Sequence, residues 1–300
     1  MRNSHQYRCA SGDTSHYYTT TDFFPVKLAQ DYTLAVHDFT GLPWWASIIL
    51  CTVMLRTVIT LPLFIVAQRN IARYANVNKD MVEVSEVLKA EVFHFSRNKN
   101  LSLQETKNLY SQQVKKQLTK KIEEHNCHPA RSFLVGMIQL PAWMSMSCAV
   151  RNLCGHSYGT IGDPFLSAKG ITDGGILWFA DLSVPDPLFI LPCLMGMTNL
   201  ILTEMHWLSM DSKITSKPLG MRIMHNSFRI ISVWLMYVAT TMPSGLVLYW
   251  LTSSLFGAIQ YVVLQQPRLR RAVRIPKIDG ESTSPMKDIA KAARIKYLRQ

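Results

Sequence analysis

The sequence has few charged residues and no recognisable catalytic motif. Only 17% of its 300 residues are Asp, Glu, Lys or Arg, whereas soluble domains carry about 25%. The chain contains no G-x-x-x-x-G-K-[ST], no H-E-x-x-H and no G-x-S-x-G. These absences argue against a nucleotide hydrolase, a zinc protease and a serine hydrolase. We therefore expect no enzymatic activity, no catalytic residue and no cofactor.

Cysteines are also few, and they lack a regular spacing. Without C-x-x-C pairs the sequence does not predict a disulfide framework. The segment "HNCHP" brings His125, Cys127 and His128 close together, but it lacks the paired ligand spacing of a zinc site. We expect a turn at a membrane surface there, and no metal site.

Acidic residues are outnumbered by basic ones. The 32 Lys and Arg against 20 Asp and Glu give a net charge of +12. Nucleic-acid binding is one explanation for such a charge, but the sequence has no RNP-like, zinc-finger or glycine-rich nucleic-acid motif. Positive loops flanking membrane helices explain the charge better, so we expect the lipid bilayer, and no nucleic acid, as a partner.

Long apolar runs are the main positive feature, because about 20 mostly apolar residues suffice for a helix to cross a bilayer. The sequence "TTMPSGL" at 240–246 interrupts the last run with a Pro-Ser-Gly turn signal. The predicted fold class is an all-α polytopic membrane protein with five transmembrane helices. The predicted spans are 44–67, 133–150, 187–207, 228–242 and 246–264.

The distribution of positive charge predicts the orientation of these spans. Of the 32 Lys and Arg, 25 lie in 69–132, 208–223 and 265–300, and only 5 lie in 1–42, 151–186 and the 243–245 turn. Basic loops stay on the inner side of a membrane. We therefore divide the chain into an outer N-terminal segment (1–42), a five-helix core (43–265) and a basic inner tail (266–300).

The inner loop 70–130 has a helical pattern. Apolar residues recur at intervals of three and four up to Phe95, and "SRNKN" breaks the pattern. Ser102 and Glu105 then have the spacing of a capping box, which starts a second helix. We expect an antiparallel helical hairpin on the inner side; the alternative is a solvated linker with accidental periodicity.

A charged residue lies inside the first span, in "MLRTVITLPL". Arg56 cannot lose its proton, and a charge in hydrocarbon is costly. One interpretation pairs Arg56 with Glu204 near the inner end of the third span. The other places Arg56 in a wet cavity with polar residues of the other spans. These polar residues are Gln139, Asn199, Thr252, Ser253, Ser254 and, further inward, Gln260.

Taken together, these motifs resemble the YidC-type membrane insertase family. The resemblance rests on the mid-membrane arginine followed by "TLPL", the basic hairpin, "IQLPAW" in the second span and "PSGLVLYW" in the fifth, and it covers about 40–265. The segments "NCHP", "GILWFADLSVPDP" and "SPMKDI" are similar to the mitochondrial branch of the family, which assists cytochrome c oxidase assembly.

The resemblance implies a function. In that family the arginine lies in a hydrophilic groove that receives a translocating polar segment, while the client's transmembrane helix slides along the apolar outer face. By motif, Arg56 is the groove cation, Gln139 belongs to "IQLP" and Trp250 to "LYW". The implied location is the mitochondrial inner membrane, with the N-terminus in the intermembrane space and the C-terminus in the matrix.

The resemblance also implies partners. The expected clients are hydrophobic membrane proteins, above all oxidase subunit 2, whose C-terminal domain is exported; other oxidase assembly factors are possible partners. The tail 266–300 is shorter than the basic coiled coil with which some relatives hold the ribosome, so stable ribosome binding is not expected. Two alternatives remain: a small-solute transporter or channel, although no inverted repeat of broken helices is visible, and a scaffold that translocates nothing.

Overall fold

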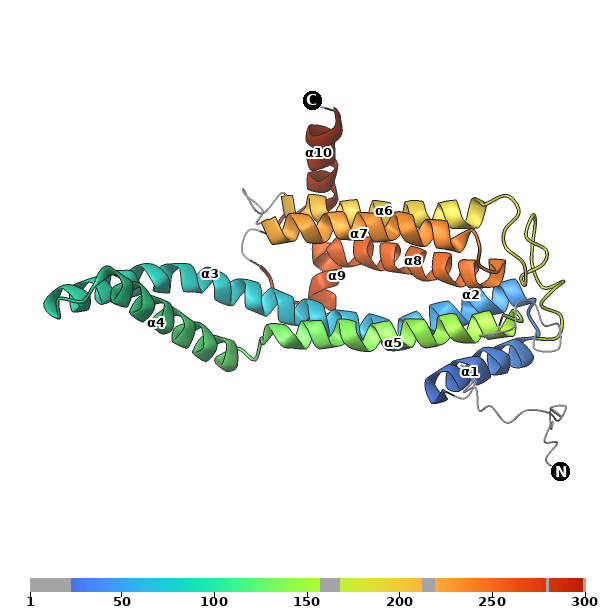
Figure 1. The fold of residues 1–300 in the computed structure, drawn as a ribbon, viewed down its shortest axis with the longest axis horizontal. Coiled ribbons are helices and arrows are strands. Elements are labelled where there is room, and N and C mark those ends of the chain that lie inside the picture. Colours follow the sequence, from blue (N-terminus) through green and yellow to red (C-terminus); the bar gives the residue numbers. More distant parts are fainter. Residues whose placement is uncertain (1–22, 157–167, 212–218, 279–280, 299–300) are drawn as a thin grey trace.

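The computed structural model describes residues 23–156, 168–211, 219–278 and 281–298, and within these ranges it contains helices and loops but no β-strand (Figure 1). The predicted all-helical class is confirmed. Three stretches of the described residues are long and apolar enough to span a membrane, namely Trp44–Asn98, Pro129–Leu153 and Ser244–Gln265. The count of five spans stays a prediction.

The first span and the first helix of the predicted hairpin form one continuous helix. It consists of α2 (Trp44–Leu55), a π-helical turn η1 (Arg56–Thr60) and α3 (Leu61–Asn98). The prediction of a span ending at residue 67 was therefore wrong about the end of the helix. No proline or glycine lies between 67 and 98, so nothing in the backbone stops the helix where the apolar run ends.

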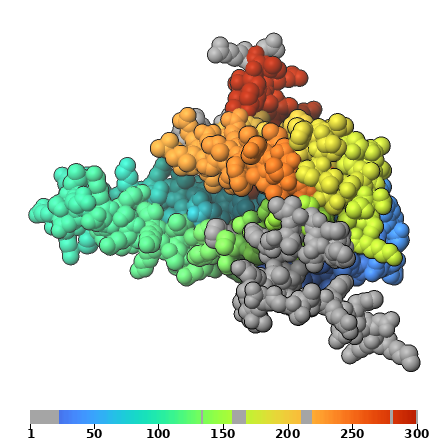
Figure 2. Space-filling model, turned by 45° about the vertical axis from the view of Figure 1, so that its right-hand side comes forward, coloured from blue at the N-terminus to red at the C-terminus, as the bar shows by residue number. Residues whose placement is uncertain are grey.

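Helix α4 (Leu103–Glu124) follows and lies beside α3 (Figure 1). The predicted capping box is confirmed: the Glu105 N–H donates to Ser102 Oγ at 3.3 Å, and the Ser102 N–H donates to Glu105 Oε2 at 2.8 Å. Buried Val77, Met81 and Cys127 form a small core between the two helices. Cys127 thus acts as a packing residue. Figure 2 shows this helix pair protruding beyond the bundle.

The remaining core helices are α5 (Pro129–Leu153), α6 (Ile190–Asp211), α7 (Leu219–Ala239) and α8 (Ser244–Gln265). Their bounds differ from the predicted spans most at α7, which begins nine residues before 228. A short turn that ends at Pro243, the N-cap of α8, separates α7 from α8. Gly196 lets α6 approach α7, because a Cβ there would lie 2.5 Å from Met236 Sδ.

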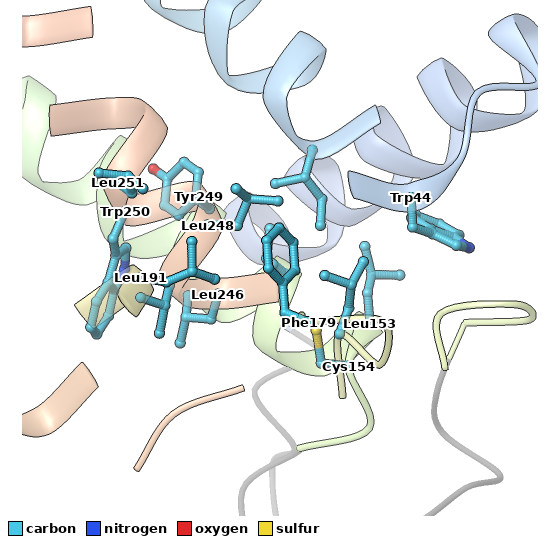
Figure 3. Close-up of a cluster of buried hydrophobic side chains, with 14 of the residues drawn as sticks. Trp44, Leu153, Cys154, Phe179, Leu191, Leu246, Leu248, Tyr249, Trp250 and Leu251 are labelled. Carbon is cyan, nitrogen blue, oxygen red and sulfur yellow. The ribbon is translucent and has the colours of Figure 1, made fainter. Parts of the chain in front are cut away.

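The main apolar core lies at one end of the bundle, which we call the loop end because the 168–189 loop and the α7–α8 turn are there (Figure 3). The Trp44 indole Nε1–H donates to the Lys169 carbonyl at 3.0 Å. Asp186 is buried, and its Oδ2 accepts the Leu191 N–H at 2.7 Å at the start of α6. Leu182 is fully buried. This loop is therefore part of the core of the protein.

Helix α1 (Phe24–Thr40) was not predicted, because its 17 residues contain no long apolar run. It packs on α5 and α2. Its Tyr32 hydroxyl donates to the Cys51 carbonyl at 3.1 Å. Gly41 ends the helix with a φ of 63°, a left-handed conformation that suits glycine.

The basic tail also folds. Helix α9 (Pro267–Ala272) leaves the end of α8 and runs toward the layer of α3 and α5, and α10 (Pro285–Leu298) packs on α6 (Figure 1). We call this end of the bundle, which also carries the α3–α4 pair, the hairpin end.

Candidate functional site

Arg56 lies in η1, and its side chain points to α8. The guanidinium Nη2 donates a hydrogen bond to Ser253 Oγ. Ser253 is buried, and so is Tyr249 one turn earlier on the same face of α8. No Asp or Glu among the described residues forms an ion pair with Arg56. The cation therefore faces the interior of the bundle with a neutral partner.

The sequence explains why the helix widens at Arg56. Pro62 has no N–H, so the Val58 carbonyl lacks the donor that a regular α-helix would supply. The Arg56 carbonyl instead accepts the Leu61 N–H in the wider π turn, and it also accepts the Thr60 hydroxyl at 2.9 Å. Such single π turns are frequent at functional sites.

Trp250 lies on α8 but belongs to its packing against α5. Its indole Nε1–H donates to Ser147 Oγ at 3.0 Å, and its ring stacks on Trp143 with centroids 5.8 Å apart. The Tyr249 hydroxyl donates to the Trp143 carbonyl at 3.4 Å. These bonds fix α8, and with it Ser253, relative to α5.

Of the other predicted groove residues, Thr252 and Asn199 have hydrogen-bond partners other than Arg56. The Thr252 hydroxyl donates to the Leu248 carbonyl of its own helix at 2.8 Å, and Asn199 Nδ2 approaches Met195 Sδ at 3.1 Å. Gln139 and Gln260 are half-buried. A cavity shared by these residues and Arg56 stays a prediction. Ser147 and Tyr249 were not singled out from the sequence, although the four-residue spacing of Tyr249 and Ser253 places both on one face of α8.

The alternative pairing of Arg56 with Glu204 is wrong. Glu204 Oε1 lies 2.6 Å from Arg229 Nε and 3.2 Å from His225 Nε2, both on α7. Its Oε2 accepts from Lys296 Nζ at 2.9 Å and from the Tyr297 hydroxyl at 2.5 Å, both on α10. Glu204 thus joins three helices at the hairpin end.

A pocket of about 390 Å³ lies between α6 and α7, away from Arg56. It is mostly apolar. Its lining residues are Leu202, Thr203, His206, Trp207, Met221, Met224, His225 and Phe228.

Arg56 is a half-buried cation in an apolar helix of a basic helical protein, and comparison with known proteins decides the family. The model of the family described as "60Kd inner membrane protein" matches residues 35–271. This chain belongs to that family. The match includes α2 to α8 and excludes α10.

Several relatives of the 60Kd inner membrane protein family are mitochondrial. The cytochrome c oxidase assembly protein COX18 of Homo sapiens is 36% identical over 277 residues, which cover 91% of this chain and 80% of the relative. The Mus musculus protein of the same name is 35% identical over 274 residues, or 91% of this chain and 81% of the relative. The Arabidopsis thaliana mitochondrial inner membrane protein OXA1 is 25% identical over 256 residues, or 85% of this chain and 53% of the relative. The chain is a mitochondrial inner-membrane protein with several membrane-spanning helices.

Proposed function

We propose that this protein is a membrane insertase of the mitochondrial inner membrane that serves cytochrome c oxidase assembly. Membership of the family and the printed names of the COX18 relatives support the assignment. The single observation that carries the mechanism is Arg56, a permanent cation in an apolar helix whose partner is a neutral serine hydroxyl. A cation that has no carboxylate partner among the described residues is available to a negatively charged client.

The geometry of Arg56 supports a role in holding polar client segments. At 4 Å, two opposite charges attract by about 4 kcal/mol at an effective dielectric constant of 20, against about 1 kcal/mol in water. A client carboxylate that replaces Ser253 as partner of Arg56 gains from this difference. The client's own apolar helix enters the lipid at the same time.

Export needs no nucleotide in this scheme. The matrix is the electrically negative side, and moving one charge across 100 mV is worth about 2.3 kcal/mol. An acidic segment that travels to the intermembrane space moves in the favourable direction. Partition of the client helix into lipid and the membrane potential are therefore sufficient driving forces.

In this proposal the hairpin end lies in the matrix and the loop end in the intermembrane space. The charge distribution supports this orientation. The α3–α4 pair meets hydrophobic clients in the matrix, and we propose oxidase subunit 2, with its exported C-terminal domain, as the principal client. Other oxidase assembly factors are further partners, and a stable ribosome contact is not part of the scheme.

The test compares Arg56→Ala with Arg56→Lys in mitochondria that lack the native protein. Protein abundance and export of the subunit 2 C-terminal domain are measured. We expect normal abundance for both variants, at least tenfold slower export for Arg56→Ala, and substantial export for Arg56→Lys because the charge is retained. A pure scaffold would not need the cation, so normal export by an abundant Arg56→Ala protein would refute the insertase mechanism.

A further inference from the structure

Two side chains of α3 donate hydrogen bonds to main-chain carbonyls of the C-terminal tail. Arg69 donates from Nε and Nη2 to the Val273 carbonyl at 2.9 and 2.8 Å. Asn76 Nδ2 donates to the Lys277 carbonyl at 2.9 Å. Two turns of helix separate Arg69 from Asn76, so both lie on one face of α3, about 10 Å apart.

This contact depends little on the sequence of the bound segment, because both acceptors are main-chain carbonyls. Every residue of a polypeptide has a carbonyl oxygen, and the side chain of Lys277 is exposed. Ile275, between the two bonded carbonyls, is the buried side chain of the segment, at 1% exposure. Residues 275–278 form neither helix nor strand. Val273 and Arg274 form the turn that ends α9, with Arg274 at a φ of 54°. The face of α3 around Arg69 and Asn76 therefore fits an irregular polypeptide with one apolar side chain.

The position of this contact matters for the proposed function. Helix α9 crosses from the end of α8 toward the layer of α3 and α5 (Figure 1), and the tail segment that follows is bonded to α3. Arg69 follows Arg56 by 13 residues on the same continuous helix, or about 20 Å toward the hairpin end. Along this helix, Arg69 and its contact with the tail therefore lie on the hairpin-end side of Arg56.

We infer that the face of α3 around Arg69 and Asn76 is a polypeptide-binding surface, which residues 273–277 occupy at rest and an extended client segment occupies during insertion. This inference rests on the proposed function and adds the entry step to it. The client replaces the tail's carbonyls with its own, so the hydrogen bonds lost and gained are of the same kind.

Contacts on both sides of residues 273–277 allow this segment to leave α3 while the rest of the tail stays bound. On its C-terminal side, Lys296 and Tyr297 of α10 stay bonded to Glu204. On its N-terminal side, Arg270 Nε lies 2.9 Å from Glu281 Oε1, and Arg271 also pairs with Glu281. These ion pairs hold the chain on both sides of residues 273–277. Exchange requires only residues 273–277 to lift from α3.

The first experiment fixes the tail on α3 in the full chain. Cysteines at 76 and 277 (Asn76→Cys with Lys277→Cys) are oxidised to a disulfide, and insertion of a membrane protein with an acidic C-terminal segment is measured in proteoliposomes. We expect at least tenfold slower insertion than by the reduced protein, with recovery after dithiothreitol. Each variant with only one of the two engineered cysteines, treated with the same oxidant, is the matched control. Equal insertion rates before and after reduction overturn the inference.

The second experiment does not depend on insertion activity. A synthetic acidic peptide without Lys or Arg, carrying one activated cysteine, is added to detergent-solubilised full chain bearing Asn76→Cys or Asn78→Cys. Residue 78 is exposed and lies on the other side of α3, so it reports chance collisions. We expect cross-linking at residue 76 to be at least fivefold faster. Faster or equal cross-linking at residue 78 overturns the binding surface even if the protein proves to be an insertase; cross-linking at 76 by a protein that inserts nothing refutes the proposed function alone.

Discussion

At the scale of single residues, two polar contacts of α8 have different roles. Ser253 accepts a hydrogen bond from Arg56, whereas Trp250, three residues earlier, donates to Ser147 on α5. We propose that a client group replaces Ser253 in the first contact, because Ser253 is neutral. The second is a packing contact, since Trp250 is buried at 7% exposure.

Ser147→Ala tests the packing role of Trp250. The change removes the acceptor of a buried indole N–H, which costs about 1–3 kcal/mol in the free energy of unfolding. Chemical denaturation in detergent measures that loss. Ser227→Ala on α7 is the control, because Ser227 is exposed and bonds its own helix, and it should change stability by less than about 0.5 kcal/mol. Equal effects of the two substitutions would show that the Trp250 bond contributes no specific stability.

At the scale of helices, Arg56 lies in the π turn η1, which Pro62 favours because it has no N–H to donate. Pro62→Ala restores the missing N–H and favours a regular α-helix, in which the residues on the two sides of the turn change their relative rotation. We expect unchanged or raised thermal stability together with reduced client export. Pro129→Ala is the control, since a proline in the first turn of α5 costs no hydrogen bond.

Reduced export together with unchanged or raised stability would identify the π turn as functional. Thermal unfolding and export are measured on the same preparations. Loss of both stability and export by Pro62→Ala would instead mean that proline is needed for folding, and the functional interpretation of η1 would be wrong.

The docking of α10 is the second element-scale feature, and we expect it to depend on pH. Partial burial lowers the pKa of Lys296, but the hydrogen bonds and charges of Glu204 and Tyr297 outweigh it, so its pKa is raised above the ordinary value. A raised lysine pKa stabilises docking below the ordinary pKa of about 10.4, and this stabilisation is lost as the pH rises through the folded value. We expect α10 to become protease-sensitive at alkaline pH.

Lys296→Gln should make α10 sensitive already at neutral pH, because Glu204 loses one cation. Limited proteolysis between pH 7 and 11 measures the effect, with the exposed Lys287→Gln of the same helix as control. Identical proteolysis profiles for the two variants would contradict a role of the Lys296–Glu204 pair in docking.

At the scale of the whole molecule, the orientation in the membrane can be tested with engineered cysteines. The native Cys127 and Cys154 are buried and unsuited as reporters. Thr172 at the loop end and Gln104 at the hairpin end are exposed. In intact mitoplasts an impermeant maleimide should label Thr172→Cys and not Gln104→Cys; after lysis it should label both. The parent protein is the control for native thiols, and the reverse pattern of labelling would invert the proposed topology.

The sequence by itself determined the class of the molecule and most of its helices. Apolar runs of about 20 residues and their punctuation by "PSGL" or a capping box are local signals, and hydrophobic burial and backbone capping act locally enough to be predicted. The family motifs likewise lie in short segments. Helix ends were predicted less well, because the apolar pattern ends at residue 67 but nothing stops the backbone of α2–α3 before Asn98.

Only the tertiary structure decided which polar residues meet. Glu204 could have neutralised Arg56 by residue type and approximate depth, but helix rotation turns it toward Arg229 and Lys296, and Arg56 toward Ser253. The tail 266–300 has the composition of a solvated basic segment, yet Ile275 is buried and the carbonyl of Val273 accepts hydrogen bonds from Arg69 of α3. The Arg56–Ser253 and Arg69–Val273 contacts join residues 197 and 204 positions apart, and the geometry of all these contacts depends on the rotation and offset of whole helices. One sequence carries no local signal for that rotation.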